Sequence, residues 1–336
     1  MRKLLAARCL WGADSLDKTS TGMEDVTTSS IARMTDERQS PLVRVQAGQT
    51  LAHLGDSRPG VGVDPETDLP DIVWCEAPAG PFLMGSTDAD EMTYSSEKPQ
   101  HEMTLPAFKI AKYPVTNVQY AAFVKAGGYR EPRYWTEAGW RLQEWLESTG
   151  ARDYGEPFNL SNHPVVGVNW YAAMAFCHWL TEQLHQSGQL QADKEITLPT
   201  EPQWEKAARG ADGCIYPWGN DPDPNQANYS STGIGTTSAV GCFPGGISSY
   251  RVQDLSGNVW EWCRTRWEMN YKYYSNDNDL AEPFGGSNDR VLRGGSFNLN
   301  EDQIRAAYRS MDRANAQDAR YGFRVVMTCF SLSSGD

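Results

Sequence analysis

The side chains of this chain that could bind a metal or act as nucleophiles include seven cysteines and five histidines. The cysteines form no Cys-x-x-Cys pair and show no regular spacing, which indicates neither a zinc ribbon nor a disulfide framework. We interpret them as buried, reduced thiols. The cysteines stand at positions 9, 75, 177, 214, 242, 263 and 329, and the histidines at positions 53, 101, 163, 178 and 185.

The histidines lack the spacing of a metal site. His178 and His185 share a predicted helix but stand seven residues apart, and the sequence offers no evident third ligand. We interpret His101 and His163 as hydrogen-bonded loop residues. The histidines therefore give no basis for a metal centre.

Carboxylates beside tryptophans are a second candidate for chemistry. If residues 259–262 form a strand, Trp260 and Trp262 face one way and Glu261 faces the other. A carboxylate placed between two buried rings needs a polar or charged partner. Asp254 stands seven residues earlier, so the loop 254–261 carries two such groups.

Composition and charge exclude several classes of function. The 43 acidic side chains outnumber the 30 basic ones, and the net charge of −13 repels nucleic-acid phosphate. No apolar run approaches the roughly 20 residues that span a bilayer. We therefore expect neither a nucleic-acid nor a membrane partner. The first eight residues lack a signal-peptide pattern, so we expect a cytoplasmic protein.

The elements that must position these groups are predicted to be mixed helices and strands. Turn-forming residues 78–80 indicate a hairpin between strands 73–76 and 82–85. Helical spacing and caps predict helices over 117–126 and 170–186, and Thr200 with Gln203 forms a capping box at the start of a third helix. Residues 323–326 are a further predicted strand. This mixture indicates an α+β fold, and the 12 Trp, 15 Tyr and 30 Gly indicate many loops held by buried rings.

The chain is predicted to divide after the N-terminal part, which is either the end of a longer solenoid or a segment that packs on the main domain. Residues 41–55 have helical periodicity, with Pro41 at the start and Gly55 at the end, and the pattern resembles the second helix of a HEAT repeat. Residues 22–40 read as a flexible connection. We therefore divide the chain into a helical segment with its linker (1–65), a main domain (66–330) and a tail (331–336).

Nine motifs in a fixed order give the main domain a family resemblance. Together they resemble the formylglycine-generating enzyme, or sulfatase-modifying factor, family over about residues 72–328. The resemblance implies a C-type-lectin-like fold. The motifs are residues 79–86, 97–101, 113–117, 163–170, 198–205, 216–220, 254–262, 293–297 and 321–325.

The resemblance also implies a calcium site in the loop 254–262. Matched position by position, Asp254 and Glu261 would give carboxylate oxygens, and Gly257 and Val259 would give backbone carbonyls, a ligand mixture that suits calcium. The alternative is that the two carboxylates cap loop amides or pair with an arginine.

Catalysis is where the chain departs from the family. Formylglycine-generating enzymes use a close cysteine pair after the Gly-Gly-Ser motif to bind copper, but here no cysteine lies between Cys263 and Cys329. We therefore expect no copper and no formylglycine formation. A related branch, the ergothioneine-type sulfoxide synthases, binds iron through three histidines, and the five histidines here do not show that spacing.

The polar segment 297–321 lies between the motifs 293–296 and 322–325. It resembles the variable region of retroelement-diversified proteins, which use the same lectin-like fold as a ligand-binding scaffold. Arg305, Arg309 and Arg324 are predicted to be structural partners of acidic loops. The candidate ligand-binding residues are Phe297, Leu299, Glu301, Tyr308, Ser310, Asp312, Asp318 and Arg320.

Three functions remain open. The first is a non-catalytic module that binds a protein or other ligand through 297–321 and nearby aromatic loops such as 135–145, within a larger HEAT-repeat signalling or defence protein. The second is a metal- and oxygen-dependent oxidoreductase related to the formylglycine-generating enzyme. The third is a purely structural subunit.

Overall fold

A computed structural model describes residues 21–272 and 289–329. The predictions for the first eight residues and for the tail 331–336 lie outside the described residues. Across the described parts, no helix is both long enough and apolar enough to cross a membrane.

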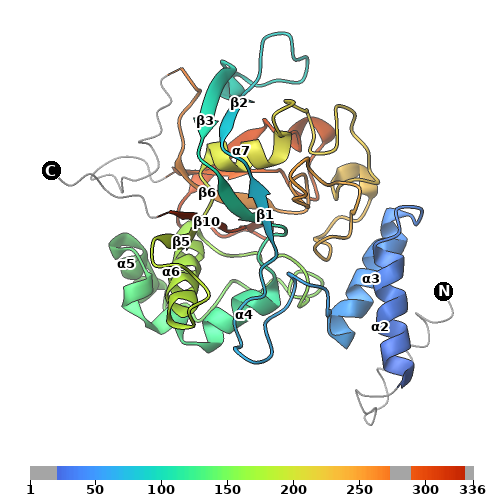
Figure 1. The fold of residues 1–336 in the computed structure, drawn as a ribbon, viewed down its shortest axis with the longest axis vertical. Coiled ribbons are helices and arrows are strands. Elements are labelled where there is room, and N and C mark those ends of the chain that lie inside the picture. Colours follow the sequence, from blue (N-terminus) through green and yellow to red (C-terminus); the bar gives the residue numbers. More distant parts are fainter. Residues whose placement is uncertain (1–20, 273–288, 330–336) are drawn as a thin grey trace.

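Two four-stranded sheets and one two-stranded hairpin form the centre of the molecule (Figure 1). Every strand pair is antiparallel except β6 with β9, which is parallel. The first sheet has the order β1 (Trp74–Ala77), β4 (Phe108–Ala111), β10 (Val326–Cys329), β5 (Lys194–Thr197). The second has the order β8 (Arg309–Arg313), β7 (Asp289–Arg293), β6 (Trp260–Arg266), β9 (Tyr321–Gly322), and the hairpin joins β2 (Gly80–Met84) to β3 (His101–Leu105).

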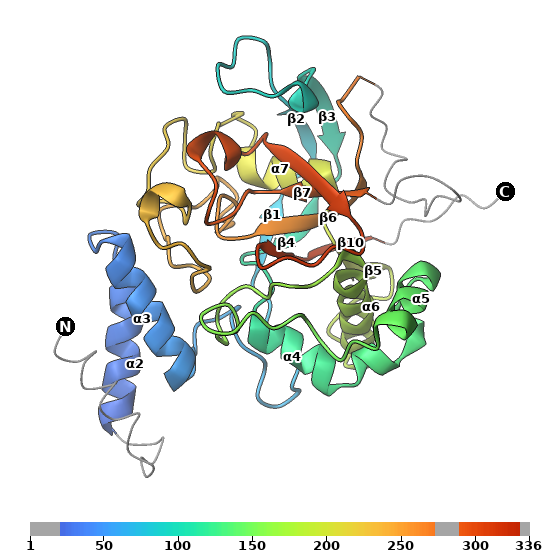
Figure 2. The ribbon, with the colours of Figure 1, turned by 180° about the vertical axis from the view of Figure 1, so that it is seen from behind.

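Helices cover the strands on two sides. Figures 1 and 2 show α4 (Asn117–Lys125), α5 (Glu137–Leu146) and α6 (Trp170–Gln186) grouped on one side of β5 and β10, and α7 (Glu201–Arg209) on the other. The capping box predicted for α7 is confirmed, because the Gln203 amide donates to Thr200 Oγ1 and the Thr200 amide to Gln203 Oε1. The predicted α+β class with much irregular structure is confirmed.

The predicted hairpin between residues 73–76 and 82–85 is wrong. β1 pairs with β4, and β2 pairs with β3, so the two strands enter different sheets. The turn between them is held from outside, because Lys206 Nζ donates to the carbonyls of Pro78 (2.7 Å) and Gly80 (2.9 Å). The turn residues 78–80 correctly indicated a change of chain direction. The strand partners, however, are set by contacts between distant parts of the chain.

The N-terminal segment is a helical hairpin that packs on the main domain (Figure 2). The helix predicted at 41–55 is confirmed as α3 (Pro41–Leu54), but the expected flexible connection contains α2 (Thr21–Met34). Val26, Ser30 and Met34 are buried at a spacing of four residues, and this periodicity is hidden in a Thr- and Ser-rich sequence. The cluster that joins the hairpin to the domain contains Met34, Val45, Ala47, Leu51, Ala239, Cys242 and Phe243.

Candidate ligand-binding face

The segment 297–321 connects β7 to β9 and carries the 3-10 helix η6 (Glu301–Gln303) and the edge strand β8. Its start is fixed through the backbone: the Phe297 amide donates to the Asn258 carbonyl (3.1 Å), and the Leu299 carbonyl accepts from Ser230 (2.9 Å). β8 pairs along its length with β7. The segment therefore has a defined path over the domain.

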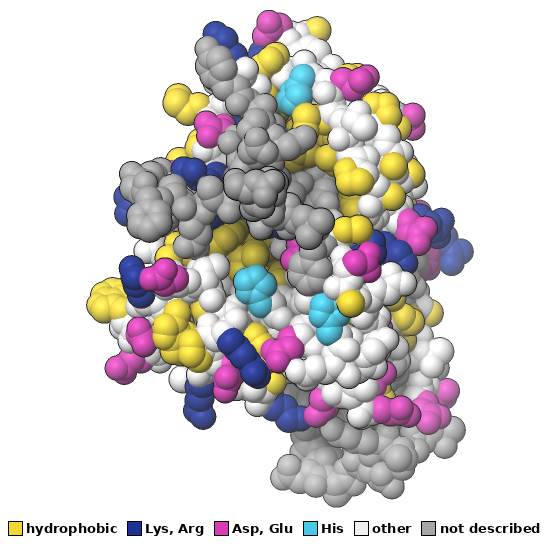
Figure 3. Space-filling view, turned by 60° about the vertical axis from the view of Figure 1, so that its left-hand side comes forward, with side chains coloured by type: hydrophobic (Ala, Val, Ile, Leu, Met, Phe, Trp, Pro, Cys, Tyr) yellow, Lys and Arg dark blue, Asp and Glu magenta, His cyan; other side chains and the backbone are white. Residues whose placement is uncertain are grey.

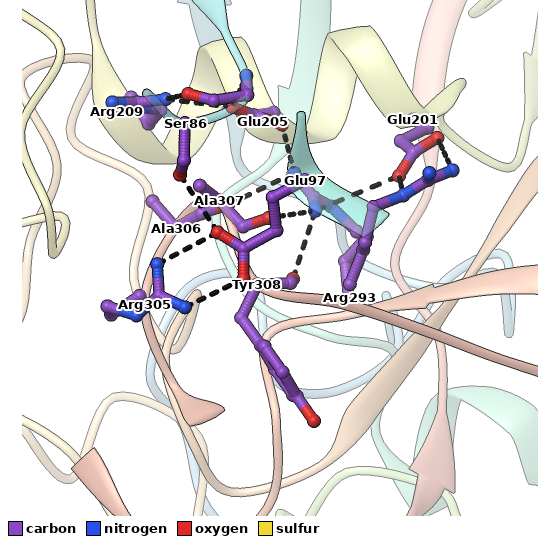
Figure 4. Close-up of polar contacts among 12 residues, drawn as sticks. Ser86, Glu97, Glu201, Glu205, Arg209, Arg293, Arg305, Ala306, Ala307 and Tyr308 are labelled. Carbon is purple, nitrogen blue, oxygen red and sulfur yellow. Dashed lines mark hydrogen bonds and ion pairs between the residues drawn. The ribbon is translucent and has the colours of Figure 1, made fainter. Parts of the chain in front are cut away.

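Buried ion pairs lie under the middle of this segment (Figure 4). Arg305 and the fully buried Glu97 are joined by two hydrogen bonds, of 2.7 and 2.9 Å, and Ser86 Oγ donates to the same carboxylate (2.8 Å). Arg309 pairs in the same two-bonded way with Glu201, at 2.7 and 2.8 Å. The predicted role of Arg305 and Arg309 as partners of acidic residues is confirmed.

Arg293 holds the backbone between these two pairs. Its guanidinium donates to the carbonyls of Ala306 (3.0 Å), Ala307 (2.9 Å) and Tyr308 (2.9 Å), and it pairs with Glu205. Burial alone would raise the pKa of Glu205, but Arg293 and Arg209 hold that pKa below its usual value. Figure 4 shows the Tyr308 ring pointing away from these charges. The network therefore fixes the main chain of 305–309 without using that side chain.

The eight predicted ligand-binding residues differ in exposure. Phe297 is only 8% exposed and packs on the Phe158 ring at 5.9 Å, so its place among the contact residues is corrected: it is a core residue. Glu301 is exposed. The half-buried residues are Leu299, Tyr308, Ser310, Asp312, Asp318 and Arg320.

Trp260 brings several of these residues together. Its ring lies 5.7 Å from that of Tyr308, and its amide donates to the Arg320 carbonyl (2.8 Å). Tyr321, its partner in the register of β6 and β9, donates its hydroxyl to Asp312 Oδ2 (2.8 Å). Leu299 and Glu301 lie at the other end of the segment, where Tyr216 donates to the Glu301 carbonyl (3.0 Å).

Sequence reasoning missed Tyr94, which reaches the segment from the loop between β2 and β3. Tyr94 is 39% exposed, its ring lies 5.0 Å from that of Tyr308, and its hydroxyl donates to Asp302 Oδ2 (2.6 Å). This hydrogen bond is the first cause that raises the pKa of Tyr94 to about 12. We define the display face as Tyr94 with the exposed and half-buried residues Leu299, Glu301, Asp302, Tyr308, Ser310, Asp312, Asp318 and Arg320, while Trp260 is a buried core residue that packs against the Tyr308 ring.

The aromatic loop expected at 135–145 is largely a helix. Trp135 is buried and donates its indole N–H to the Gly128 carbonyl (2.9 Å), while α5 begins at Glu137. Of Trp135 and Trp145, the residues that end this segment, only Trp145 is exposed to solvent, with 79% of its surface accessible. Ala138, Trp140 and Leu142 of α5 pack against the core, whereas Trp145 in its last turn does not.

In the loop 254–261, the Glu261 carboxylate pairs with an arginine, which is one of the two roles predicted for it. Arg324 donates to both Glu261 oxygens (2.6 and 2.7 Å), and Trp204 donates to one of them (2.7 Å). Asp254 Oδ2 accepts from the Gly241 amide (2.7 Å). Glu261 is thus paired with Arg324 in this structure. Calcium binding by Asp254, Gly257, Val259 and Glu261 stays a prediction, and it would require Arg324 to release Glu261.

The described cysteines and histidines have structural surroundings. Cys75, Cys177, Cys242 and Cys263 are buried, and no described cysteine is in a disulfide. His163 is fully buried with Nδ1 3.0 Å from Thr237 Oγ1, and burial lowers its pKa to about 3, so the ring is neutral. Within 21–272 and 289–329, no three His, Cys, Asp or Glu side chains are grouped to hold a metal.

The surface seen in Figure 3 is mixed in charge. On the face shown, Lys and Arg side chains lie beside Asp and Glu side chains, with hydrophobic ones between them. No basic stripe of the kind that follows nucleic-acid phosphates is visible in this view.

Comparison with known proteins decides the family. The model of the "Sulfatase-modifying factor enzyme 1-like domain" matches residues 59–329. The chain belongs to this family. The formylglycine-generating enzyme of Thermomonospora curvata is 32% identical in an alignment of length 297 that covers 74% of this chain and 91% of that protein.

Other relatives of this sulfatase-modifying factor domain are longer. The serine/threonine-protein kinase Pkn1 of Chlamydia trachomatis is 32% identical over 270 residues, 79% of this chain but 39% of the kinase. A hercynine oxygenase of Mycolicibacterium thermoresistibile is 31% identical over 269 residues, 73% of this chain and 56% of the oxygenase. The chain thus spans about two fifths to three fifths of the length of these relatives.

Solved structures confirm the fold. PvdO from Pseudomonas aeruginosa has a TM-score of 0.62 at 24% identity and covers 81% of this chain and 99% of its own. Treponema denticola variable protein 1 has a TM-score of 0.57 at 25% identity and covers 77% and 95%. The predicted formylglycine-generating-enzyme-type, C-type-lectin-like fold is therefore confirmed.

Proposed function

We propose that this chain is a non-catalytic module that binds a protein ligand through the display face. The observation that carries the proposal is the contrast within one segment. The main chain of 305–309 is fixed by Arg293, Glu97 and Glu201, while side chains before and after it are exposed or half-buried. A fixed backbone that presents polar and aromatic side chains suits recognition.

The relatives support a binding role in a larger protein. The chain resembles Treponema denticola variable protein 1, and it aligns with only 39% of the serine/threonine-protein kinase Pkn1, so a domain of this type occurs within longer chains. The HEAT-like α3 suits attachment to a helical repeat. We therefore place the chain in a larger cytoplasmic signalling or defence protein, with the display face turned to its ligand.

Site-specific photo-crosslinking tests the proposal. A photoreactive phenylalanine analogue at Ser310 or Asp312 should give the same discrete protein adduct in cells of the source organism. The same analogue at Leu83 or Trp145, which are exposed elsewhere, should not give it. Equal adducts from both pairs of positions, or none from the display face, would contradict the proposal.

Diversification of the display face is a separate part of the proposal. Sequences of the same locus from sibling strains should differ mainly at the exposed positions of 297–321 and should keep Arg293, Arg305 and Arg309. Substitutions spread evenly along the chain would contradict diversification while leaving a fixed binding role intact.

The alternative function is a metal- and oxygen-dependent oxidoreductase. The observation in its favour is the 31–32% identity to a hercynine oxygenase and a formylglycine-generating enzyme. Elemental analysis of the purified chain, combined with oxygen uptake in the presence of thiol peptides, separates the two. Stoichiometric copper or iron with oxygen uptake would favour the enzyme, and calcium alone would favour the binding module.

A further inference from the structure

The display face presents two aromatic rings, Tyr94 and Tyr308, and the buried ring of Trp260 packs against Tyr308. Tyr94 precedes the 3-10 helix η1 (Ser95–Glu97), Trp260 opens β6, and Tyr308 precedes β8. The Tyr308 ring lies 5.0 Å from Tyr94 and 5.7 Å from Trp260. Tyrosine side chains are enriched among the residues that dominate binding energy at protein interfaces, so the Tyr94 and Tyr308 pair is the centre of the face.

The face carries three carboxylates: Asp302 contacts Tyr94, Glu301 precedes Asp302 in the chain, and Asp312 lies farther along β8. Asp302 accepts from the Tyr94 hydroxyl (2.6 Å), Asp312 from the Tyr321 hydroxyl (2.8 Å), and Glu301 begins η6. Among the described residues, none of these three carboxylates forms an ion pair. Glu301 and Asp302 therefore carry negative charge that no ion pair among the described residues neutralises, while Asp312 lies close enough to Arg320 to interact with it electrostatically.

The arginines of the segment 297–321 form ion pairs with other carboxylates or lie on the other side of β8. Arg305 and Arg309 are paired with the buried Glu97 and Glu201. Arg313 follows Asp312 directly in β8, so its side chain points to the opposite side of the strand. Arg320 pairs with Asp318 at 2.6 Å. The part of the face around Tyr94 and Tyr308 thus combines ring faces with uncompensated carboxylates.

We infer that the display face takes a basic segment of a protein partner, with an arginine or lysine side chain at the rings of Tyr94 and Tyr308 and the carboxylates of Glu301, Asp302 and Asp312 around it. The inference rests on the proposed function and adds the chemistry of the partner. Ring faces attract cations, and the net charge of −13 attracts a basic partner from a distance.

Selection from a random displayed-peptide library tests the inference. Peptides are selected on the wild-type chain and depleted on the Tyr94→Ala/Tyr308→Ala variant, whose fold is checked by near-ultraviolet circular dichroism. The peptides that depend on the face should be enriched in arginine and lysine over the starting library. A selected basic peptide is then synthesised, and its affinity is measured at low and high salt.

The charge variants give the second readout. The triple variant Glu301→Gln, Asp302→Asn, Asp312→Asn should bind the basic peptide about tenfold more weakly and with less salt dependence. The matched control Glu66→Gln, Glu137→Gln, Glu144→Gln removes three exposed carboxylates elsewhere and should bind like the wild type.

The possible outcomes separate the claim of a basic partner from the claim that the chain is a binding module. Face-dependent peptides without basic enrichment, or a triple variant that behaves like its control, would overturn the basic partner and leave the binding module standing. A selection that yields no face-dependent peptide would overturn both.

Discussion

Arginine and carboxylate side chains serve opposite purposes in two neighbouring regions of this molecule. Under residues 305–309, Arg293 and Glu205 are both 0% exposed and are surrounded by further hydrogen bonds. On the display face, Arg320 and Asp318 are 34% and 33% exposed. Burial makes the first pair a structural requirement, because neither charge can turn to water, whereas solvent leaves the second pair free to exchange partners. The same chemistry thus builds a fixed support and an adaptable surface within one segment.

The largest expected effect comes from breaking the buried support. Glu205→Gln leaves Arg293 without its nearest carboxylate, and the free energy of unfolding should fall by about 3–5 kcal/mol in urea denaturation. The control Glu137→Gln removes the exposed partner of Arg141 and should change stability by less than about 0.5 kcal/mol. A loss below about 1 kcal/mol for Glu205→Gln would mean that the buried network is not a support.

Asp254 gives a pH test, because it is a buried carboxylate whose neighbour Arg324 is already paired with Glu261. Burial raises the pKa of Asp254 to about 6 in the folded chain, against about 3.9 when unfolded. The folded state therefore binds the proton more tightly, so this stabilisation is complete below pH 4 and is lost as the pH rises through 6. The change should be about 3 kcal/mol, and Asp254→Asn should abolish it. An unchanged pH profile in that variant would contradict the assignment.

Coupling between Glu97 and Arg305 tests whether the support acts in pairs. Glu97→Gln and Arg305→Met should each destabilise the chain, because each leaves one buried charge without its partner. The double variant should be about 2 kcal/mol more stable than the sum of the two losses predicts. Purely additive losses in a double-mutant cycle would show that the two residues act independently.

The smallest expected effect comes from the display face itself. The combined variant Glu301→Gln, Ser310→Ala, Asp312→Asn, Asp318→Asn should shift the free energy of unfolding by about 1 kcal/mol or less. Thermal and urea unfolding would check this. A loss of unfolding free energy as large as that of Glu205→Gln would show that these surface residues stabilise the fold as much as the buried network does.

Sequence patterns predicted what depends on neighbours in the chain. The capping box at Thr200 and the ends of α6 are local, and the motif order identified the fold. The need of Arg305 for an acidic partner was also predictable from charge, but the choice of Glu97, 208 residues away, was not. Tyr94 was missed for the same reason, since only the folded chain brings its loop to Asp302. The helix α2 was missed because its buried positions are few and lie among threonines and serines.

The three carbonyls held by Arg293 belong to the main chain, and every residue type has such a carbonyl. The hydrogen bonds from Arg293 therefore do not depend on the side chain at the half-buried position 308, whereas Ala306 and Ala307 are buried and leave no room for larger residues. In the proposed binding module, a substitution at position 308 would change the presented side chain while these three hydrogen bonds are kept. The path of the main chain and the side chain presented at position 308 can therefore change independently during evolution.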